Sequence, residues 1–174
     1  MKKTLYLLAA LLVLANLAIS AQTGSLTEEE QNYLAKGYRI DNNGWIFLHV
    51  EGKPFEIGFQ RGYMTAAEIN DFRETERHLI KHQTSRDYDF FVKKASELFK
   101  KKISKEYVDE MQGMAAGMTR AGHAISYDEI LYLNGIIDIN AYWWPKEKDK
   151  AKEGGPGCSA FIATGKETAD GKIV

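Results

Sequence analysis

No charge of one sign dominates this chain, since 23 Lys and Arg residues are balanced by 24 Asp and Glu residues. The sequence also lacks a basic block with interleaved aromatic residues, so nothing in it would attract the phosphates of a nucleic acid. We therefore expect no nucleic-acid partner. The hydrophobic fraction of 44% is that of an ordinary globular protein, and the length is enough for about one domain.

The chain also lacks an apolar run long enough to cross a membrane. Residues 5–17 are apolar apart from Asn16, whereas a spanning helix needs about 20 apolar residues. Two lysines precede this run and small residues follow it, which is the layout of a secretory signal peptide. We predict a signal peptide over residues 1–21, a mature chain that is exported to a periplasmic or extracellular location, and no stable membrane anchor.

Cysteine is almost absent, because Cys158 is the single one. An exported chain meets an oxidising compartment in which cysteines usually pair, so an unpaired thiol suggests a reactive group or a bridge between two chains. The alternative is a buried, unreactive cysteine that packs as a small apolar residue. The count alone leaves these alternatives open.

Local patterns predict mostly helices in the first 140 residues. Residues 27–30 and 126–129 both have the capping-box pattern of Thr or Ser followed three positions later by Glu. Residues 55–103 have a helical spacing of apolar positions that is interrupted at Thr84-Ser85, and Ser104 is placed to cap a further helix.

Two further patterns predict a strand and a close helix contact. The turn residues 41–44 precede an aromatic and β-branched stretch, Trp45–Val50, which predicts a strand. Gly113 and Gly117 lie four residues apart on one helical face, and we expect this face to pack closely on a sheet.

The sequence changes character after residue 145. A charged stretch and then Gly154-Gly155-Pro156-Gly157 predict an exposed loop, which is suited to proteolytic cleavage. Residues 158–164 are strand-like, a turn follows, and the second strand of this expected hairpin has barely begun at Val174. We therefore expect the chain to be the N-terminal fragment of a longer protein.

Gly157-Cys158-Ser159 is the candidate site, because it lies where the exposed loop enters the strand-like segment. A cut before Cys158 would leave a thiol and a free α-amine on the same residue. That amine titrates near pH 8 in model compounds, so it can act as the general base for the thiol without a histidine.

Five segments together resemble the acyl-CoA:6-aminopenicillanic acid acyltransferase family. These are N-terminal-nucleophile hydrolases, related to the choloylglycine hydrolases and the phospholipase B-like proteins. The segments occur in this order along the chain: Glu51–Gly62, Tyr107–Met118, Ile130–Asn134, Gly157–Gly165 and Asp170–Val174.

The resemblance implies an α+β fold, the four-layer αββα sandwich, of which this chain would be the helix-rich N-terminal part plus the first hairpin. It implies self-cleavage between Gly157 and Cys158 and a thioester on Cys158, with the further catalytic groups beyond Val174. The chain would comprise the signal peptide 1–21, an N-terminal (alpha) segment 22–157 and the start of the catalytic (beta) segment, 158–174.

The expected activity is that of an amidohydrolase or acyltransferase acting on a small-molecule acyl amide, with the rest of its own chain as partner. Two alternatives stay open: a phospholipase B-like lipid deacylase acting on an ester, and a non-enzymatic binding domain with a buried cysteine. The acyl group, the acceptor and the oligomeric state are not predicted.

We expect no cofactor and no metal site. His78 and His82 lie four apart on a helical pattern, but a catalytic zinc usually needs three protein ligands. His49 and His123 are isolated, and Arg61 and Arg73 are expected to be exposed or ion-paired. The aromatic run at 142–144 either lines a pocket near the processing loop or packs a helix end against the sheet.

Overall fold

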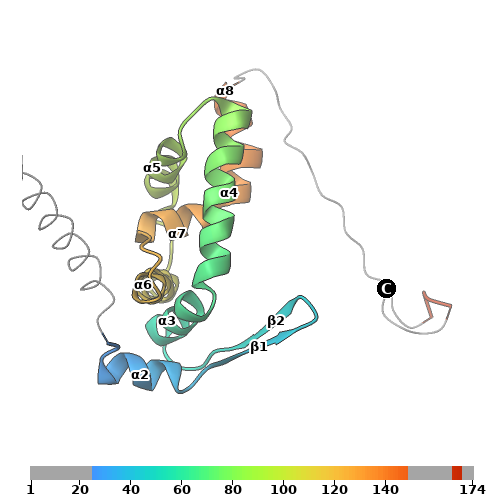
Figure 1. Ribbon diagram of the computed structural model, residues 1–174. Coiled ribbons are helices and arrows are strands. Elements are labelled where there is room, and N and C mark those ends of the chain that lie inside the picture. Colours follow the sequence, from blue (N-terminus) through green and yellow to red (C-terminus); the bar gives the residue numbers. More distant parts are fainter. Residues whose placement is uncertain (1–24, 149–165, 170–174) are drawn as a thin grey trace, which may run out of the picture. The chain divides into compact units, whose positions relative to one another are not determined.

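A computed structural model describes residues 25–148 and 166–169 (Figure 1). The chain divides into two compact units, one up to Gly135 and one from Ile136. The described part is mainly helical, with seven α-helices, one π-helix and one small antiparallel hairpin. None of the described helices is both long enough and apolar enough to cross a membrane.

The first unit contains the hairpin and six α-helices. They are α2 (Glu28–Leu34), β1 (Tyr38–Asn42), β2 (Trp45–His49), α3 (Pro54–Met64), α4 (Ala66–Thr84), α5 (Tyr88–Phe99), α6 (Lys105–Arg120) and α7 (Tyr127–Asn134). The described part of the second unit contains the π-helix η1 (Asp138–Trp143) and α8 (Trp144–Lys148).

The described residues contain both helices and strands, as the predicted α+β class requires. They are mainly helical, and their strands form one hairpin. The strand predicted at 45–50 is confirmed as β2, but its partner β1 is not predicted. Asp41 and Asn42 belong to β1, and the turn is the pair Asn43-Gly44, whose φ angles of 50° and 83° are left-handed. Asn-Gly is the favoured sequence for such a two-residue turn, and it sets the register from Tyr38↔His49 to Asn42↔Trp45.

The first hairpin expected from the family resemblance is a different one. It falls on residues 158–174, and all of these except 166–169 lie outside the described residues.

Both predicted capping boxes are confirmed. The Thr27 hydroxyl accepts from the Glu30 N–H at 3.2 Å while the Glu30 carboxylate accepts from the Thr27 N–H at 2.8 Å. Ser126 and Glu129 repeat this arrangement at the start of α7. Each pair satisfies two N–H groups that a helix start otherwise leaves without an intrahelical partner.

The long helical stretch is interrupted as predicted, and once more. Ser85, with a φ of 59°, ends α4, and the additional break lies at Thr65 between α3 and α4. Ser104 precedes α6, but its side chain makes no capping hydrogen bond. Gly122 follows the end of α6 with a φ of 90°, a conformation that glycine adopts at little cost.

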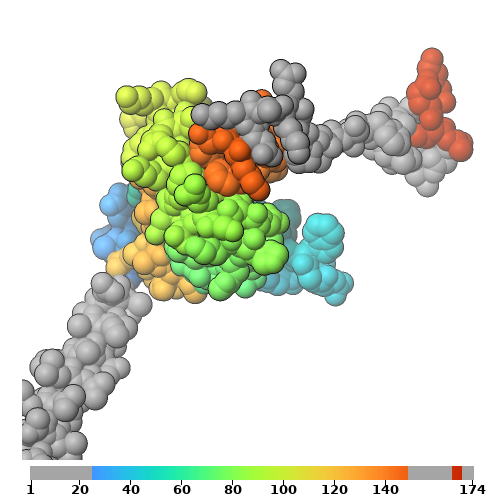
Figure 2. Space-filling view, turned by 90° about the horizontal axis from the view of Figure 1, so that it is seen from above, coloured from blue at the N-terminus to red at the C-terminus, as the bar shows by residue number. Residues whose placement is uncertain are grey.

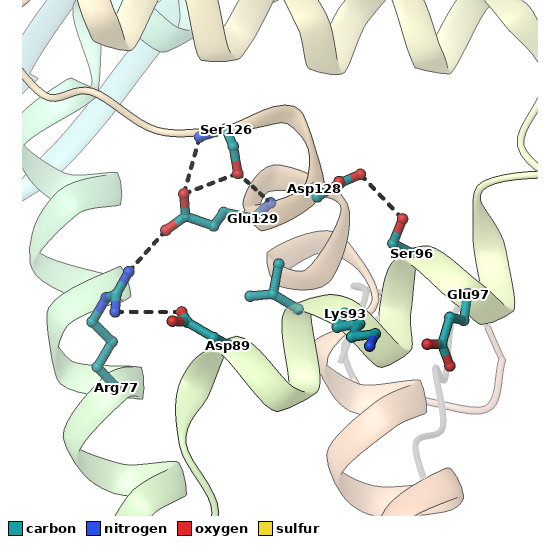
Figure 3. Close-up of a pocket in the computed structure, with 9 residues that line it drawn as sticks. Arg77, Asp89, Lys93, Ser96, Glu97, Ser126, Asp128 and Glu129 are labelled. Atoms are coloured by element: carbon teal, nitrogen blue, oxygen red, sulfur yellow. Dashed lines mark hydrogen bonds and ion pairs between the residues drawn. The ribbon is translucent and has the colours of Figure 1, made fainter.

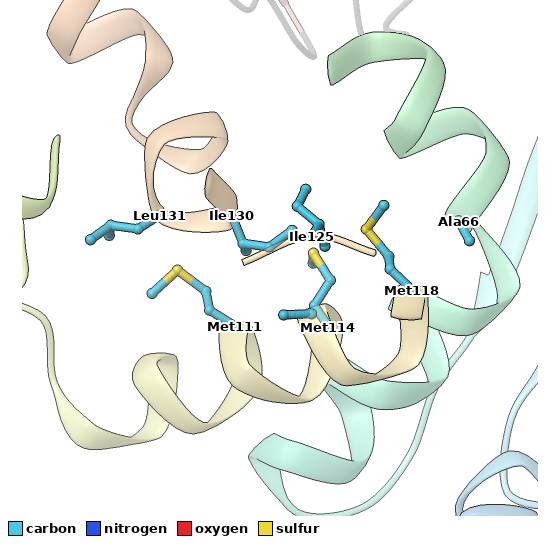
Figure 4. Packing of buried hydrophobic residues seen from close by; sticks show 8 residues of the cluster. Ala66, Met111, Met114, Met118, Ile125, Ile130 and Leu131 are labelled. Atoms are coloured by element: carbon cyan, nitrogen blue, oxygen red, sulfur yellow. The ribbon is translucent and has the colours of Figure 1, made fainter. Parts of the chain in front are cut away.

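The core of the first unit joins α4, α6 and α7 (Figure 4). Three methionines of α6 point toward apolar residues of α7 and of the loop before it. The buried members are Ala66, Met111, Met114, Ala115, Met118, Ile125, Ile130 and Leu131. Methionine is flexible and fills irregular gaps between packed helices.

The glycine-rich face of α6 packs on a helix, so the prediction that it packs on a sheet is wrong. A Cβ atom added at Gly113 would lie 2.1 Å from the Phe55 carbonyl oxygen, and one added at Gly117 would lie 2.2 Å from that of Phe59. Both oxygens belong to α3. The prediction failed because glycine spacing indicates a close contact but not which element makes it.

Helix α3 meets this face with two glycines of its own. A Cβ at Gly58 would lie 1.8 Å from the Glu110 carbonyl oxygen, and one at Gly62 would lie 2.1 Å from that of Met114. The two helices therefore touch backbone to backbone, with no side chain between them at these four positions. This crossing fixes α3, and through it the hairpin that precedes α3.

Candidate functional site

The predicted nucleophile and cleavage point, Cys158 and Gly157, lie outside the described residues. The described residues nevertheless contain three of the five segments on which the family resemblance rests. Glu51–Gly62 leads into and forms most of α3, Tyr107–Met118 forms most of α6, and Ile130–Asn134 ends α7.

These three segments, far apart in the sequence, pack together in the first unit. The first two supply all four glycines of the α3–α6 crossing. The third supplies Ile130 and Leu131, which are 0% and 2% exposed and belong to the same core cluster as the methionines of α6. The segments thus describe one packed arrangement of helices.

A polar groove of about 470 Å³ lies in the first unit (Figure 3). Side chains of α4, α5 and the start of α7 line it, among them Arg77, Asp89, Ser96, Ser126, Asp128 and Glu129. Figure 3 shows these groups facing one another across the groove.

Arg77, Ser96, Asp89, Asp128 and Glu129 of the groove contact each other across the helices. Arg77 donates to Glu129 at 3.0 Å and lies 3.8 Å from the Asp89 carboxylate. Ser96 donates to Asp128 at 3.2 Å. Because Asp89, Asp128 and Glu129 each hold a partner from another helix, this arrangement is a network that joins α4, α5 and α7.

The two serines of the groove donate to carboxylates, Ser96 to Asp128 and Ser126 to Glu129 at 3.0 Å, and not to a histidine base among the described residues. The Ser126 hydroxyl also accepts the Glu129 N–H at 3.2 Å as a helix cap. Arg77 also lies over the ring of Tyr88, 4.3 Å from its centroid. Burial raises the pKa of the Tyr88 hydroxyl far above its usual value, with the Glu129 charge acting in the same direction. This phenol therefore stays protonated and is no base.

A second hollow, of about 140 Å³, is mostly apolar. Its lining includes Met114 and Ile130 of the core cluster, together with Phe72 and Arg61. It brings no pair of reactive groups together.

The histidines are not gathered into a metal site within the described ranges. His78 and His82 are both exposed on α4, and no group of three or more metal-ligating side chains occurs in the described part of the chain. His49 stacks on the ring of Tyr38 with 5.0 Å between centroids and lies 3.8 Å from the Glu51 carboxylate.

The two arginines are ion-paired, as predicted. Arg61 lies 3.9 Å from Glu110, and Arg73 lies 3.8 Å from Glu129. Arg73 also donates to the Ala124 carbonyl at 2.7 Å, so it holds the loop before α7.

The aromatic run 142–144 lies in the second unit. The Trp143 and Trp144 rings contact each other with centroids 6.3 Å apart, while Tyr142 is 45% exposed.

Two residues that hold the hairpin are missed by sequence analysis. Arg39 of β1 donates to the Met64 carbonyl at 2.7 Å and to the Glu68 carboxylate at 2.6 Å. Gln60 is fully buried, and its amide both donates to the Glu51 carbonyl at 2.7 Å and accepts from the Glu51 N–H at 3.0 Å. The sequence carries no signal for either role, because both depend on contacts between elements.

The chain is 30% identical, over 190 aligned residues, to a protein of Archaeoglobus fulgidus that is described as uncharacterized. The alignment covers 97% of this chain and 30% of the relative, so the chain spans about a third of the length of the relative it matches. No family model matches the chain. No solved structure matches it.

Proposed function

We propose that this chain is the N-terminal part of an exported, self-processing enzyme with Cys158 as its N-terminal nucleophile. The enzyme is an amidohydrolase or acyltransferase of the N-terminal-nucleophile class, with the αββα sandwich of that class completed by residues beyond Val174. The observation that carries the proposal is Gly157-Cys158-Ser159, the single cysteine of the chain placed between a glycine-rich loop and a strand-like segment.

Two further observations support the proposal. The three resemblance segments that the structure describes pack into one arrangement of helices, as parts of a common family fold would. The matched relative is about three times as long as this chain, which leaves ample length for a catalytic segment.

The self-processing step follows from the chemistry of the junction. The Cys158 thiol attacks the Gly157 carbonyl carbon, the peptide C–N bond breaks, and the amine nitrogen of Cys158 takes a proton. Water then hydrolyses the resulting thioester, which releases a Gly157 carboxylate and regenerates the thiol. The new α-amine next to the thiol is the base for the following turnovers, since its usual pKa of about 8 is close to the operating pH.

The same thiol then takes the acyl group of a substrate. A thioester forms as the amine of the amide substrate leaves, and water or a second amine resolves it. An oxyanion hole for this step contributes about 3 kcal/mol or more, and we expect its donors beyond Val174.

The test is intact mass measurement and N-terminal sequencing of the full-length protein and of two variants. We expect the wild type to be cut between Gly157 and Cys158, the Cys158→Ala variant to stay whole, and the neighbouring Ser159→Ala control to be cut. A wild type that stays whole would remove the N-terminal-nucleophile mechanism and favour a binding domain with a buried cysteine.

A further inference from the structure

One face of the β1–β2 hairpin is apolar and is not covered by the other described elements. Side chains alternate along a strand, so the register places residues 38, 40 and 42 of β1 on the same face as residues 45, 47 and 49 of β2. Trp45 is 81% exposed, Phe47 57%, Ile40 51% and Tyr38 49%. The Tyr38 ring contacts both the Phe47 ring and the His49 ring. The face formed by Tyr38, Ile40, Asn42, Trp45, Phe47 and His49 is here called the aromatic face.

The opposite face of the hairpin points toward the helices at Arg39 and Leu48, whereas Asp41 and Ile46 near the turn are exposed. Arg39 lies on the face of β1 opposite the aromatic face. Its guanidinium donates to the Met64 carbonyl and the Glu68 carboxylate, where α3 ends and α4 begins. Figure 1 shows the hairpin extending from these helices, and Figure 2 shows it (cyan) standing out from the helices of its own unit (green).

The hairpin is also held firmly at its base. Gln60 of α3 makes two hydrogen bonds with the backbone of Glu51, two residues after the end of β2. Gly37, directly before β1, lies so close to Gln60 and to the His49 carbonyl that an added Cβ would be 2.5 Å from the Gln60 side-chain oxygen and 2.9 Å from the His49 carbonyl oxygen. The aromatic face is therefore presented in a fixed orientation, which lowers the entropy cost of binding to it.

The described helices leave this face without a cover, and that arrangement is costly in water. A lone two-stranded hairpin is marginally stable, and adjoining large apolar side chains on a surface mark an interaction site. Both outer edges of the hairpin also lack a strand partner within the described residues. Another layer of apolar residues, preferably a sheet, would cover the face and pair the edges.

We propose that the aromatic face docks against an apolar sheet face in the continuation of the same polypeptide beyond Val174. This rests on the proposed function, because that function requires a sheet-forming catalytic segment there. About 70% of the matched relative lies outside the matched region, so a protein of that length has room for a further sheet.

The charges of the hairpin do not favour a lipid surface. Elements that lie on membranes usually carry Lys or Arg around their apolar face, whereas this face has only His49 and Asn42 as polar members. The single hairpin arginine points to the helices.

The test is photo-cross-linking within the full-length protein. A benzophenone amino acid is introduced as Phe47→p-benzoylphenylalanine, with Tyr38→p-benzoylphenylalanine as a second site on the same face. Ile46→p-benzoylphenylalanine is the matched control, because Ile46 is next to Phe47 and on the other face of β2. Cross-linked peptides are identified by mass spectrometry.

We expect positions 47 and 38 to cross-link to peptides beyond residue 174 of the same polypeptide, at a yield at least about tenfold above that of position 46. Cross-links to a second copy, adducts to lipid, or a yield no higher than the control at both positions would each overturn the proposal.

Scoring cleavage between Gly157 and Cys158 in the same samples separates this inference from the proposed function. If the wild type is not cut but positions 47 and 38 still cross-link beyond residue 174, the docking holds and the function fails. If the wild type is cut and these cross-links are absent, the docking fails alone.

Discussion

At the scale of single residues, a buried carboxylate and two buried phenols stand out. Glu76 of α4 is 4% exposed, and the fully buried Tyr132 of α7 donates its hydroxyl to that carboxylate at 2.7 Å. Tyr88 of α5 is equally buried and packs edge-on against the Tyr132 ring, but its hydroxyl has no hydrogen-bond partner among the described residues. The two tyrosine rings are thus buried against each other, but only the Tyr132 hydroxyl makes a hydrogen bond.

This difference gives a matched pair of variants. Tyr132→Phe removes a hydrogen bond from the buried Glu76 carboxyl group, and we expect it to lower the free energy of unfolding by about 1–3 kcal/mol. Tyr88→Phe removes a hydroxyl that is buried without a partner, so we expect it to be neutral or stabilising. Urea denaturation of both variants measures the difference, and equal losses would contradict the assignment of the bond.

Sequence analysis could not have found this pair. Tyr132 lies in the segment Ile130–Asn134, which resembles the acyltransferase family. Its partner Glu76 is 56 residues away in a helix rich in exposed charges. By contrast, it was predictable that Arg61 and Arg73 would be exposed or ion-paired, because arginine is rarely buried without a partner. Their individual partners were not predictable, since those depend on how the helices pack.

At the scale of elements, the α3–α6 crossing fixes how the first unit is built. Four glycines let two backbones approach to a distance that no side chain would allow. Such crossings are familiar where small residues are spaced four apart on both partners.

Adding one methyl group at this crossing should be costly. Alanine in an open helix position is more stable than glycine by about 1 kcal/mol, so Gly58→Ala would stabilise α3 if the helices did not touch. Because the new Cβ would lie 1.8 Å from the Glu110 carbonyl oxygen, we expect a loss of about 1–3 kcal/mol or more instead. The sign of the change in thermal denaturation decides between the two cases.

The elements themselves were predictable where their signals are local. Capping boxes and apolar spacing predict α2, α7 and most of α3–α6, since each signal lies within one turn or one face. Strand β1 was missed because Tyr-Arg-Ile-Asp-Asn mixes charged and apolar residues, and its pairing depends on the turn that follows. The break at Thr65 carries no glycine or proline to mark it.

At the scale of the whole first unit, ion pairs connect elements that the core does not join. Arg120 of α6 lies 2.6 Å from Glu30 of α2, Lys36 pairs with Glu56 of α3, and Arg39 of β1 pairs with Glu68 of α4. In each case a hydrogen bond from the basic partner is the main cause that lowers the pKa of the glutamate below its ordinary value of 4.5.

These lowered pKa values predict loss of stability in acid. A carboxyl whose pKa is lower in the folded state stabilises the fold fully above its unfolded pKa, and this contribution is lost as the pH falls through the folded value. We therefore expect the urea midpoint to be constant near neutral pH and to fall below about pH 4.5. Each pair is partly exposed, so each contributes little alone.

Glu68→Gln checks the assignment. The amide cannot lose a charge in acid, so the variant should start with a lower midpoint at neutral pH and lose less of it on acidification. A variant that is as acid-sensitive as the wild type would show that the Arg39 pair has no part in the effect.

The overall class was only partly predictable at this scale. The helix-rich character follows from local periodicity, but the predicted αββα sandwich needs strands that the described residues do not contain. The predicted cleavage point, Gly157 and Cys158, lies outside the described residues and stays a prediction. The Gly58–Gly62 spacing was visible in the sequence beside that of Gly113 and Gly117, and comparing the two would have suggested that these faces meet.

The α3–α6 crossing also gives a fixed reference for comparing relatives of this chain. Side-chain cores adjust when their residues change, because rotamers and helix positions shift to fill the new volume. Where two backbones touch directly, the separation is set by covalent geometry and atomic radii. Any relative with glycine at these four positions should therefore superimpose closely on α3 and α6, however much its methionine core has changed. Structural differences in other elements can then be measured after superposition on these two helices.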